Sequence, residues 1–121
     1  MSAVIRQGRY QGLTANGVTE YRGIPFALPP LGEHRFKAPR PLPDGDNALV
    51  ADHYPQPSLQ MKNPLMGVHE SREDCLYLNI WVPEGEGPFP VMVWFHGGAY
   101  LAGSISQPLY NGAELARSQR V

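Results

Sequence analysis

Residues 91–100 read Val-Met-Val-Trp-Phe-His-Gly-Gly-Ala-Tyr, an apolar run that ends abruptly in a glycine turn. The first five residues favour a buried strand. The His-Gly-Gly that follows predicts a tight turn, because glycine carries no Cβ to block a close approach of the backbone. Successive N–H groups in such a turn can converge on one point and stabilise a negatively charged oxygen there. Taken alone, the stretch predicts a sheet strand followed either by an anion-stabilising loop or by a plain tight turn.

Two stretches nearer the amino terminus also predict sheet structure. Residues 76–82 are apolar at nearly every position, as expected of a strand covered on both faces, and with residues 91–95 they would begin a central sheet. The pair Asn16-Gly17 is a strong hairpin signal, because a type I′ turn needs positive φ at both central positions. Residues 3–26 are therefore expected to form short strands joined by tight turns.

The rest of the chain predicts a long loop and one short helix. Proline dominates residues 27–67, which are expected to form an ordered, meandering loop, since proline has no N–H to donate. Asn111 followed three residues later by Glu114 is similar to a capping box, so a helix is expected to begin there. Arg117 and Arg120 would suit the C-terminal end of its dipole.

Composition limits the classes of partner. The 121 residues are 42% hydrophobic and fit one domain, and a formal net charge of −1 gives no electrostatic reason to bind nucleic acid or an anionic membrane surface. No apolar run approaches the roughly 20 residues of a membrane helix, and we see no secretory signal. The single cysteine excludes an internal disulfide. We expect a soluble, cytoplasmic protein that binds neither nucleic acid nor membranes.

A metal site is not expected. Cys75 has no second cysteine or histidine at ligand spacing, and the four histidines are scattered through the sequence. They are His34, His53, His69 and His96.

Four blocks of sequence follow one another in a recognisable order. They are residues 21–30 (YRGIPFALPP), 35–39 (RFKAP), 73–83 (EDCLYLNIWVP) and 90–100 (PVMVWFHGGAY), the last followed by a Gly-Ser pair. Together they resemble the amino-terminal segment of the type-B carboxylesterases, the family that includes the cholinesterases. The resemblance covers the whole chain. It implies an α/β fold: the N-terminal part of an α/β-hydrolase, with a β-hairpin, a Pro-rich meander, the first strands of a mixed central sheet and one short helix. Residues 1–121 would be an incomplete amino-terminal portion of that domain.

The resemblance also assigns roles in the glycine turn. It implies that the backbone amides of Gly98 and Ala99 are two of the three donors of an oxyanion hole, with Gly97 setting the loop geometry. Tyr100 would form a wall of the substrate site. His96 is expected to shape the loop through a hydrogen bond, because the family takes its catalytic base from a later histidine.

The residues before the second strand have a structural interpretation. Glu73 and Asp74 could be paired carboxylates, but adjacent residues on a strand point to opposite faces. The resemblance instead implies a buried, bidentate ion pair between Glu73 and Arg35 that fixes the Pro-rich meander onto the sheet. In many family members the equivalent of Cys75 forms a disulfide; here Ser58 stands near the place of its partner. Cys75 is therefore expected to be a small buried thiol.

The activity that the resemblance implies is hydrolysis of small-molecule carboxylic esters by a serine nucleophile, a histidine base and an acidic partner, without metal or cofactor. None of the six serines lies in the Gly-x-Ser-x-Gly motif of the nucleophile: Ser2, Ser58, Ser71, Ser104, Ser106 and Ser118. We expect residues 1–121 to be inactive alone and to need the remainder of the domain, in cis or as a second chain. An inactive truncated fragment and a cholinesterase-like binding module remain alternatives.

Overall fold

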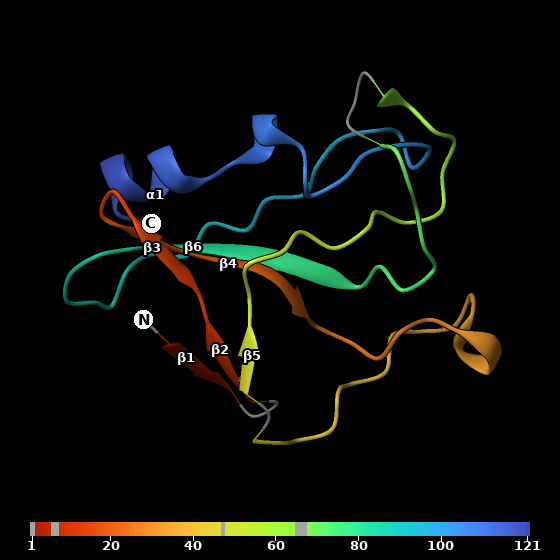
Figure 1. Ribbon diagram of the computed structural model, residues 1–121, viewed down its shortest axis with the longest axis horizontal. Helices are drawn as coiled ribbons and strands as arrows, with labels where there is room; N and C mark the ends of the chain where they lie inside the picture. Colours follow the sequence, from red (N-terminus) through yellow and green to blue (C-terminus); the bar gives the residue numbers. More distant parts are fainter. Residues whose placement is uncertain (1, 6–7, 47, 65–67) are drawn as a thin grey trace.

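The computed structural model describes residues 2–5, 8–46, 48–64 and 68–121 (Figure 1). In these residues the strands form two three-stranded sheets. The first contains β1 (Ser2–Ile5), β2 (Gly8–Gln11) and β5 (Ala48–Val50), in the order β1-β2-β5. The second contains β3 (Leu13–Ala15), β4 (Val18–Pro25) and β6 (Tyr77–Pro83), in the order β3-β4-β6. Strands β2 and β5 pair in parallel and the other pairs are antiparallel, so the first sheet is mixed.

A two-residue turn joins β3 to β4. Ala15 lies opposite Val18, and the two residues between them, Asn16 and Gly17, have φ values of 51° and 79°. Both values lie in the left-handed region that a type I′ turn requires. The predicted hairpin is confirmed.

The core joins the two sheets. It consists of Tyr10 from β2, Tyr21 and Ile24 from β4, and Ala51 just after β5, with Val82 of β6 packed against it. Strand β4 lies between β3 and β6, and its register against β6 shifts between Tyr21 and Ile24. The strand is therefore held by backbone pairing on two edges and by apolar packing on one face.

The Pro-rich segment is largely irregular, as expected. It runs out to one side of the molecule, where the 3₁₀ helix η1 (Gly32–His34) lies near its far end (Figure 1). Strand β5 was not expected within it. Its pairing with β2 continues in a hydrogen bond of 2.8 Å from the Ala51 N–H to the Gln11 carbonyl. Residues 47 and 65–67 of the predicted loop lie outside the described residues.

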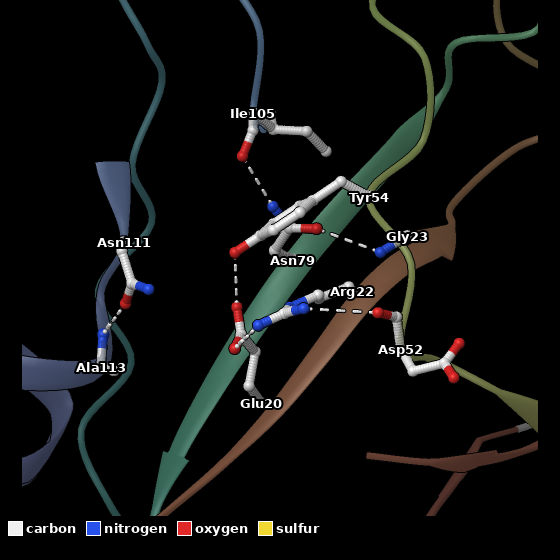
Figure 2. Close-up of polar contacts among 9 residues, drawn as sticks. All are labelled: Glu20, Arg22, Gly23, Asp52, Tyr54, Asn79, Ile105, Asn111 and Ala113. Carbon is white, nitrogen blue, oxygen red and sulfur yellow. Dashed lines mark hydrogen bonds and ion pairs between the residues drawn. The ribbon is translucent and has the colours of Figure 1, made fainter. Parts of the chain in front are cut away.

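One helix packs on the second sheet. A 3₁₀ helix, η3 (Pro108–Tyr110), precedes α1 (Ala113–Gln119), which contacts β6 and β4 (Figure 1). The side-chain oxygen of Asn111 accepts a 2.9 Å hydrogen bond from the Ala113 N–H, as Figure 2 shows. The helix begins after Gly112, one residue later than predicted. The predicted capping box is wrong in both halves, because the N-cap residue is Gly112, without a side-chain cap, and the Glu114 carboxylate pairs with Arg117.

Two expectations about the sheet are wrong. Residues 91–95 form no strand, and their side chains are exposed, 87% for Val91 and 86% for Phe95. No strand of the described chain pairs with the backbone N–H and C=O groups of this segment, so apolar composition alone does not make it a strand. Strand β6 is also covered on one face only, because Leu78 and Ile80 are 36% and 41% exposed.

Candidate functional site

The candidate site is the loop of residues 96–103, which turns back on itself. Gly98 has a φ of 131°, and the next two residues, Ala99 and Tyr100, have φ values of 52° and 59°. The carbonyl of Gly98 accepts hydrogen bonds from the N–H groups of Leu101 at 2.9 Å and Ala102 at 3.1 Å. Left-handed conformations are unusual outside glycine, and such strained residues cluster at functional sites.

Two glycines of this loop have no room for a side chain. A Cβ on Gly98 would lie 1.7 Å from the backbone oxygen of Ala102. A Cβ on Gly103 (φ 127°) would lie 2.6 Å from His96 Nδ1 and 2.8 Å from the Gly97 oxygen. At Gly97 itself, where the sequence placed the geometric requirement, a Cβ would meet nothing within 4 Å. In this structure the steric requirement falls on Gly98 and Gly103.

The two backbone amides predicted as oxyanion donors make no hydrogen bond to other described residues. Among the described residues, the N–H groups of Gly98 and Ala99 have no hydrogen-bond acceptor, and both residues are exposed. N–H donors that the protein does not satisfy internally can donate hydrogen bonds to an anionic oxygen. The assignment of these two amides to an oxyanion hole stays a prediction.

The aromatic residues of the loop differ in their surroundings. The Nδ1–H of His96 donates a 2.7 Å hydrogen bond to the Gly97 carbonyl, and the imidazole stacks on Tyr110, with 6.0 Å between ring centroids. This arrangement suits the expected part of His96 in shaping the loop. Tyr100 is fully exposed, so its predicted place in a substrate-site wall stays a prediction.

Two amide side chains tie the loop region to the rest of the molecule. Gln60 of the Pro-rich segment donates to the Gly103 carbonyl at 2.8 Å and accepts from the Gly103 N–H at 2.9 Å. Asn79 of β6 accepts from the Gly23 N–H at 3.0 Å and donates to the Ile105 carbonyl at 2.9 Å (Figure 2). The sequence analysis missed both residues. A polar amide inside the apolar run of β6 was a signal for Asn79, whereas nothing local distinguished Gln60.

Arg35 and Glu73 form an ion pair, through Arg35 Nε and Glu73 Oε1. It links the Pro-rich segment to the residues that precede β6. The side chains are 48% and 32% exposed, so the expectation of a buried pair is wrong: η1 and its flanks extend away from the core and leave the pair accessible to water. The role of the pair in fixing the meander stays a prediction.

A better-buried polar cluster lies beside β4. Glu20 accepts hydrogen bonds from Arg22 Nη2 and from the Tyr54 hydroxyl, each at 2.7 Å, and the Arg22 guanidinium lies 4.6 Å from the centre of the Tyr54 ring (Figure 2). Burial alone would raise the pKa of Glu20, but the hydrogen bonds from Arg22 and Tyr54 outweigh it and lower that pKa. Burial and Glu20 together raise the pKa of Tyr54 to about 12. Both carboxylate oxygens are occupied, so the cluster is structural.

Neither thiol nor metal chemistry has support in the described residues. Cys75 is free and half-buried, less buried than expected, because it lies just before β6 rather than in the core. Burial and the neighbouring Asp74 and Glu73 raise the pKa of its thiol, which disfavours a nucleophilic thiolate. Within the same residues, no group of three or more His, Cys, Asp or Glu side chains could hold a metal ion, and no helix is long and apolar enough to cross a membrane.

Known proteins match this chain along nearly its whole length. The pattern of the carboxylesterase family matches residues 2–121. The para-nitrobenzyl esterase of Bacillus subtilis (strain 168) is 43% identical over 119 residues, which cover 94% of this chain and 24% of that protein. The cholinesterase of Mus musculus is 40% identical over 137 residues, covering 96% of this chain and 22% of the relative.

The fold agrees with these matches. A solved thermophilic PNB esterase superposes with a TM-score of 0.91 at 40% identity, over 99% of this chain and 26% of that one. The chain thus spans about a quarter of the length of the relatives it matches. The architecture is that of a segment of an α/β-hydrolase, as the sequence predicted, with a mixed sheet, an antiparallel sheet and one short α-helix in the described residues. The sequence match and the superposition together place the chain in the carboxylesterase family.

Proposed function

We propose that this chain is the part of a serine carboxylesterase that supplies the oxyanion-hole loop. The observation that carries the proposal is the geometry at Gly98, where the backbone has no room for a Cβ and the amides of Gly98 and Ala99 have no acceptor among the described residues. Attack on an ester carbonyl moves negative charge onto the carbonyl oxygen, and preorganised N–H donors stabilise that charge. The names of the relatives, esterases and cholinesterases, support an ester as the substrate.

In the proposed mechanism this chain stabilises charge and other residues make and break bonds. A serine oxygen attacks the carbonyl carbon while a histidine takes its proton, and the resulting oxyanion accepts hydrogen bonds from Gly98 and Ala99. The serine, the histidine, its acidic partner and a third amide lie outside residues 1–121, which contain no Gly-x-Ser-x-Gly motif. Tyr100 would border the acyl or alcohol group. Residues 1–121 alone are therefore expected to be inactive.

Exposed apolar side chains support the place of this chain within a larger domain. Residues 91–95 and the outer face of β6, with Leu78 and Ile80, lie unburied in the structure. Surfaces of this kind normally pack against another element. We propose that they pack against the remainder of the α/β-hydrolase domain, in the same polypeptide or in a second chain.

The lone free cysteine is consistent with a reducing compartment such as the cytoplasm.

This proposal predicts that residues 1–121 self-associate when produced alone, because no other chain covers the apolar surface. Light scattering during gel filtration measures the expected oligomers. A monomer that melts sharply and shows no exposed apolar surface to a hydrophobic dye would contradict it.

The activity itself is tested by labelling the native protein with a fluorophosphonate, which reacts with activated serines, and reading the result on a denaturing gel. A labelled band several times larger than 13.4 kDa that carries this sequence would support the serine esterase. Label on a separate co-purifying chain would support a split enzyme. A folded native protein without label, alone or in complex, would contradict the proposal and favour the binding module or the inactive fragment.

A further inference from the structure

We propose that Gln60 is a positioning residue for the oxyanion loop, acting through Gly103. This inference rests on the proposed esterase function for its catalytic consequence and on the contacts of Gln60 for its structural part. Gln60 lies 43 residues before Gly103 in the sequence, in the Pro-rich segment, and touches none of the proposed reacting atoms.

Both the nitrogen and the oxygen of the Gln60 carboxamide make hydrogen bonds. Its Nε2 donates to the carbonyls of Gly103 at 2.8 Å and Ser58 at 3.0 Å, and its Oε1 accepts from the Gly103 N–H at 2.9 Å. The pair with Gly103 has the donor-and-acceptor pattern by which two strands exchange hydrogen bonds. An amide side chain carries its donor and its acceptor on neighbouring atoms, which match the N–H and C=O groups of one residue.

Gly103 in turn contacts the start of the loop. It is buried, and its α-carbon approaches His96 and the Gly97 carbonyl so closely that an added Cβ would lie 2.6 Å and 2.8 Å from them. Ala102, next to Gly103, sits against Gly98, whose own Cβ would be 1.7 Å from the Ala102 oxygen. A shift of Gly103 would therefore move the backbone that carries the proposed donor amides.

Other restraints on this loop are weak in the described structure. The remaining hydrogen bonds made by the described residues within 96–103 are local to the loop, from Leu101 and Ala102 to Gly98 and from His96 to Gly97. Residues 96–101 are exposed, and the one ring contact that the described structure gives them outside the loop is the stacking of His96 on Tyr110. The Gln60–Gly103 pair is thus well placed to set the loop against the Pro-rich segment, and misplacement of preorganised donors by even 1 Å lowers catalysis.

The test uses the full native polypeptide with Gln60→Met, which keeps the length of the side chain but loses its donors and acceptor. We expect kcat for a simple ester to fall by about 10-fold with KM nearly unchanged. Binding of a trifluoromethyl ketone, whose serine adduct carries an oxyanion, should weaken by a similar factor. Gln60→Glu keeps the acceptor but sets a carboxylate oxygen against the Gly103 carbonyl, and should lower kcat at least as much. Gln119→Met, on the exposed surface of α1, is the matched control and should behave as wild type.

The kcat values are calculated per serine that reacts with the fluorophosphonate, which counts only folded enzyme. If Gln60 has only a structural role, its loss lowers the folded fraction and leaves this kcat unchanged. Hydrogen exchange at the Gly103 amide gives a second readout that needs no catalysis and should be faster in Gln60→Met, which removes the acceptor of this N–H. Wild-type kcat and ketone affinity in Gln60→Met and Gln60→Glu would overturn the inference. A wild-type protein without esterase activity would overturn the proposed function and the catalytic part of the inference. Unchanged Gly103 exchange would overturn the structural part whatever the activity.

Discussion

Strand β4 contains the charged residues Glu20 and Arg22 and is largely buried, whereas residues 91–95 are uniformly apolar and exposed. Strand β4 has β3 on one edge and β6 on the other, and Tyr21 and Ile24 pack into the core between the sheets. Its charged side chains pair with each other and with Tyr54. Residues 91–95 have no paired strand in the described chain, and Trp94 makes a ring contact with Tyr110 at 6.4 Å.

The difference shows that neighbours, more than composition, decide burial. A fully buried large apolar side chain contributes about 1.5–3 kcal/mol to folding, so five exposed ones leave a large stabilisation unrealised. The buried apolar side chains of β4 make this contribution to folding. Those of residues 91–95 would make it only if another part of the domain covered them. The glycine loop that follows residues 91–95 would then be positioned at one end by that partner and at the other by Gly103.

The largest effect is expected at the loop itself. Gly98→Ala places a Cβ against the Ala102 oxygen and disfavours the φ of 131°, so the loop must rearrange. In the full polypeptide we expect kcat to fall by about 100- to 1000-fold, the loss typical of a removed oxyanion donor. Steady-state kinetics on a simple ester measure it. The control is Gly32→Ala, which also has positive φ (53°) but open space around the Cβ and lies far from the loop. Equal activity of the two variants would contradict the role of the loop.

The second test compares the two segments directly in the full polypeptide. Ile24 is 6% exposed, so Ile24→Ala should lower the free energy of unfolding by about 2–5 kcal/mol. Val93 is 70% exposed here, yet we expect Val93→Ala to lower it by about 1–3 kcal/mol, because the rest of the domain would bury this residue.

Urea unfolding of both variants against wild type gives the values. A Val93→Ala variant as stable as wild type, alongside a destabilised Ile24→Ala, would break the comparison: residues 91–95 would then be a true surface segment.

Local backbone requirements made the hairpin and the helix predictable. Asn16 and Gly17 adopt positive φ because of their own residue types, and Asn111 accepts a hydrogen bond from an N–H two residues away, just before α1. Such signals need no knowledge of the rest of the fold. The same holds for the glycine requirement of the loop, although the structure moves it from Gly97 to Gly98 and Gly103.

Contacts between distant segments were not predictable from a single sequence. Strand β5 forms because it pairs in parallel with β2, and no local pattern in the Pro-rich segment predicts that pairing. Gln60 resembles any polar loop residue until Gly103 is placed beside it. Residues 91–95 show the opposite error, since their apolar pattern predicts a strand but they pair with no strand of the described chain.

The charged cluster of β4 offers a smaller effect with a pH signature. Glu20→Gln should lower the free energy of unfolding by about 1–3 kcal/mol at pH 7, because it weakens two hydrogen bonds in a partly buried site. The pKa of Glu20 lies below its ordinary value of 4.5, so the stabilisation is present above about pH 4.5 and is lost as pH falls through the folded pKa. Urea unfolding of both proteins between pH 3 and 7 should show the difference shrinking in acid. A difference that stays constant down to pH 3 would mean that the ionised carboxylate contributes nothing.

The smallest effect is expected at Arg35 and Glu73, which form the same kind of pair as Arg22 and Glu20 but in water. With side chains 48% and 32% exposed, the pair should have a coupling energy of no more than about 1 kcal/mol. A double-mutant cycle with Arg35→Met and Glu73→Gln measures it by urea unfolding, at low and high salt. Because solvent and ions screen exposed charges, the coupling should fall further at 1 M salt. A coupling of several kcal/mol that resists salt would show that the rest of the domain covers this pair too, and would make the Pro-rich segment resemble β4 rather than residues 91–95.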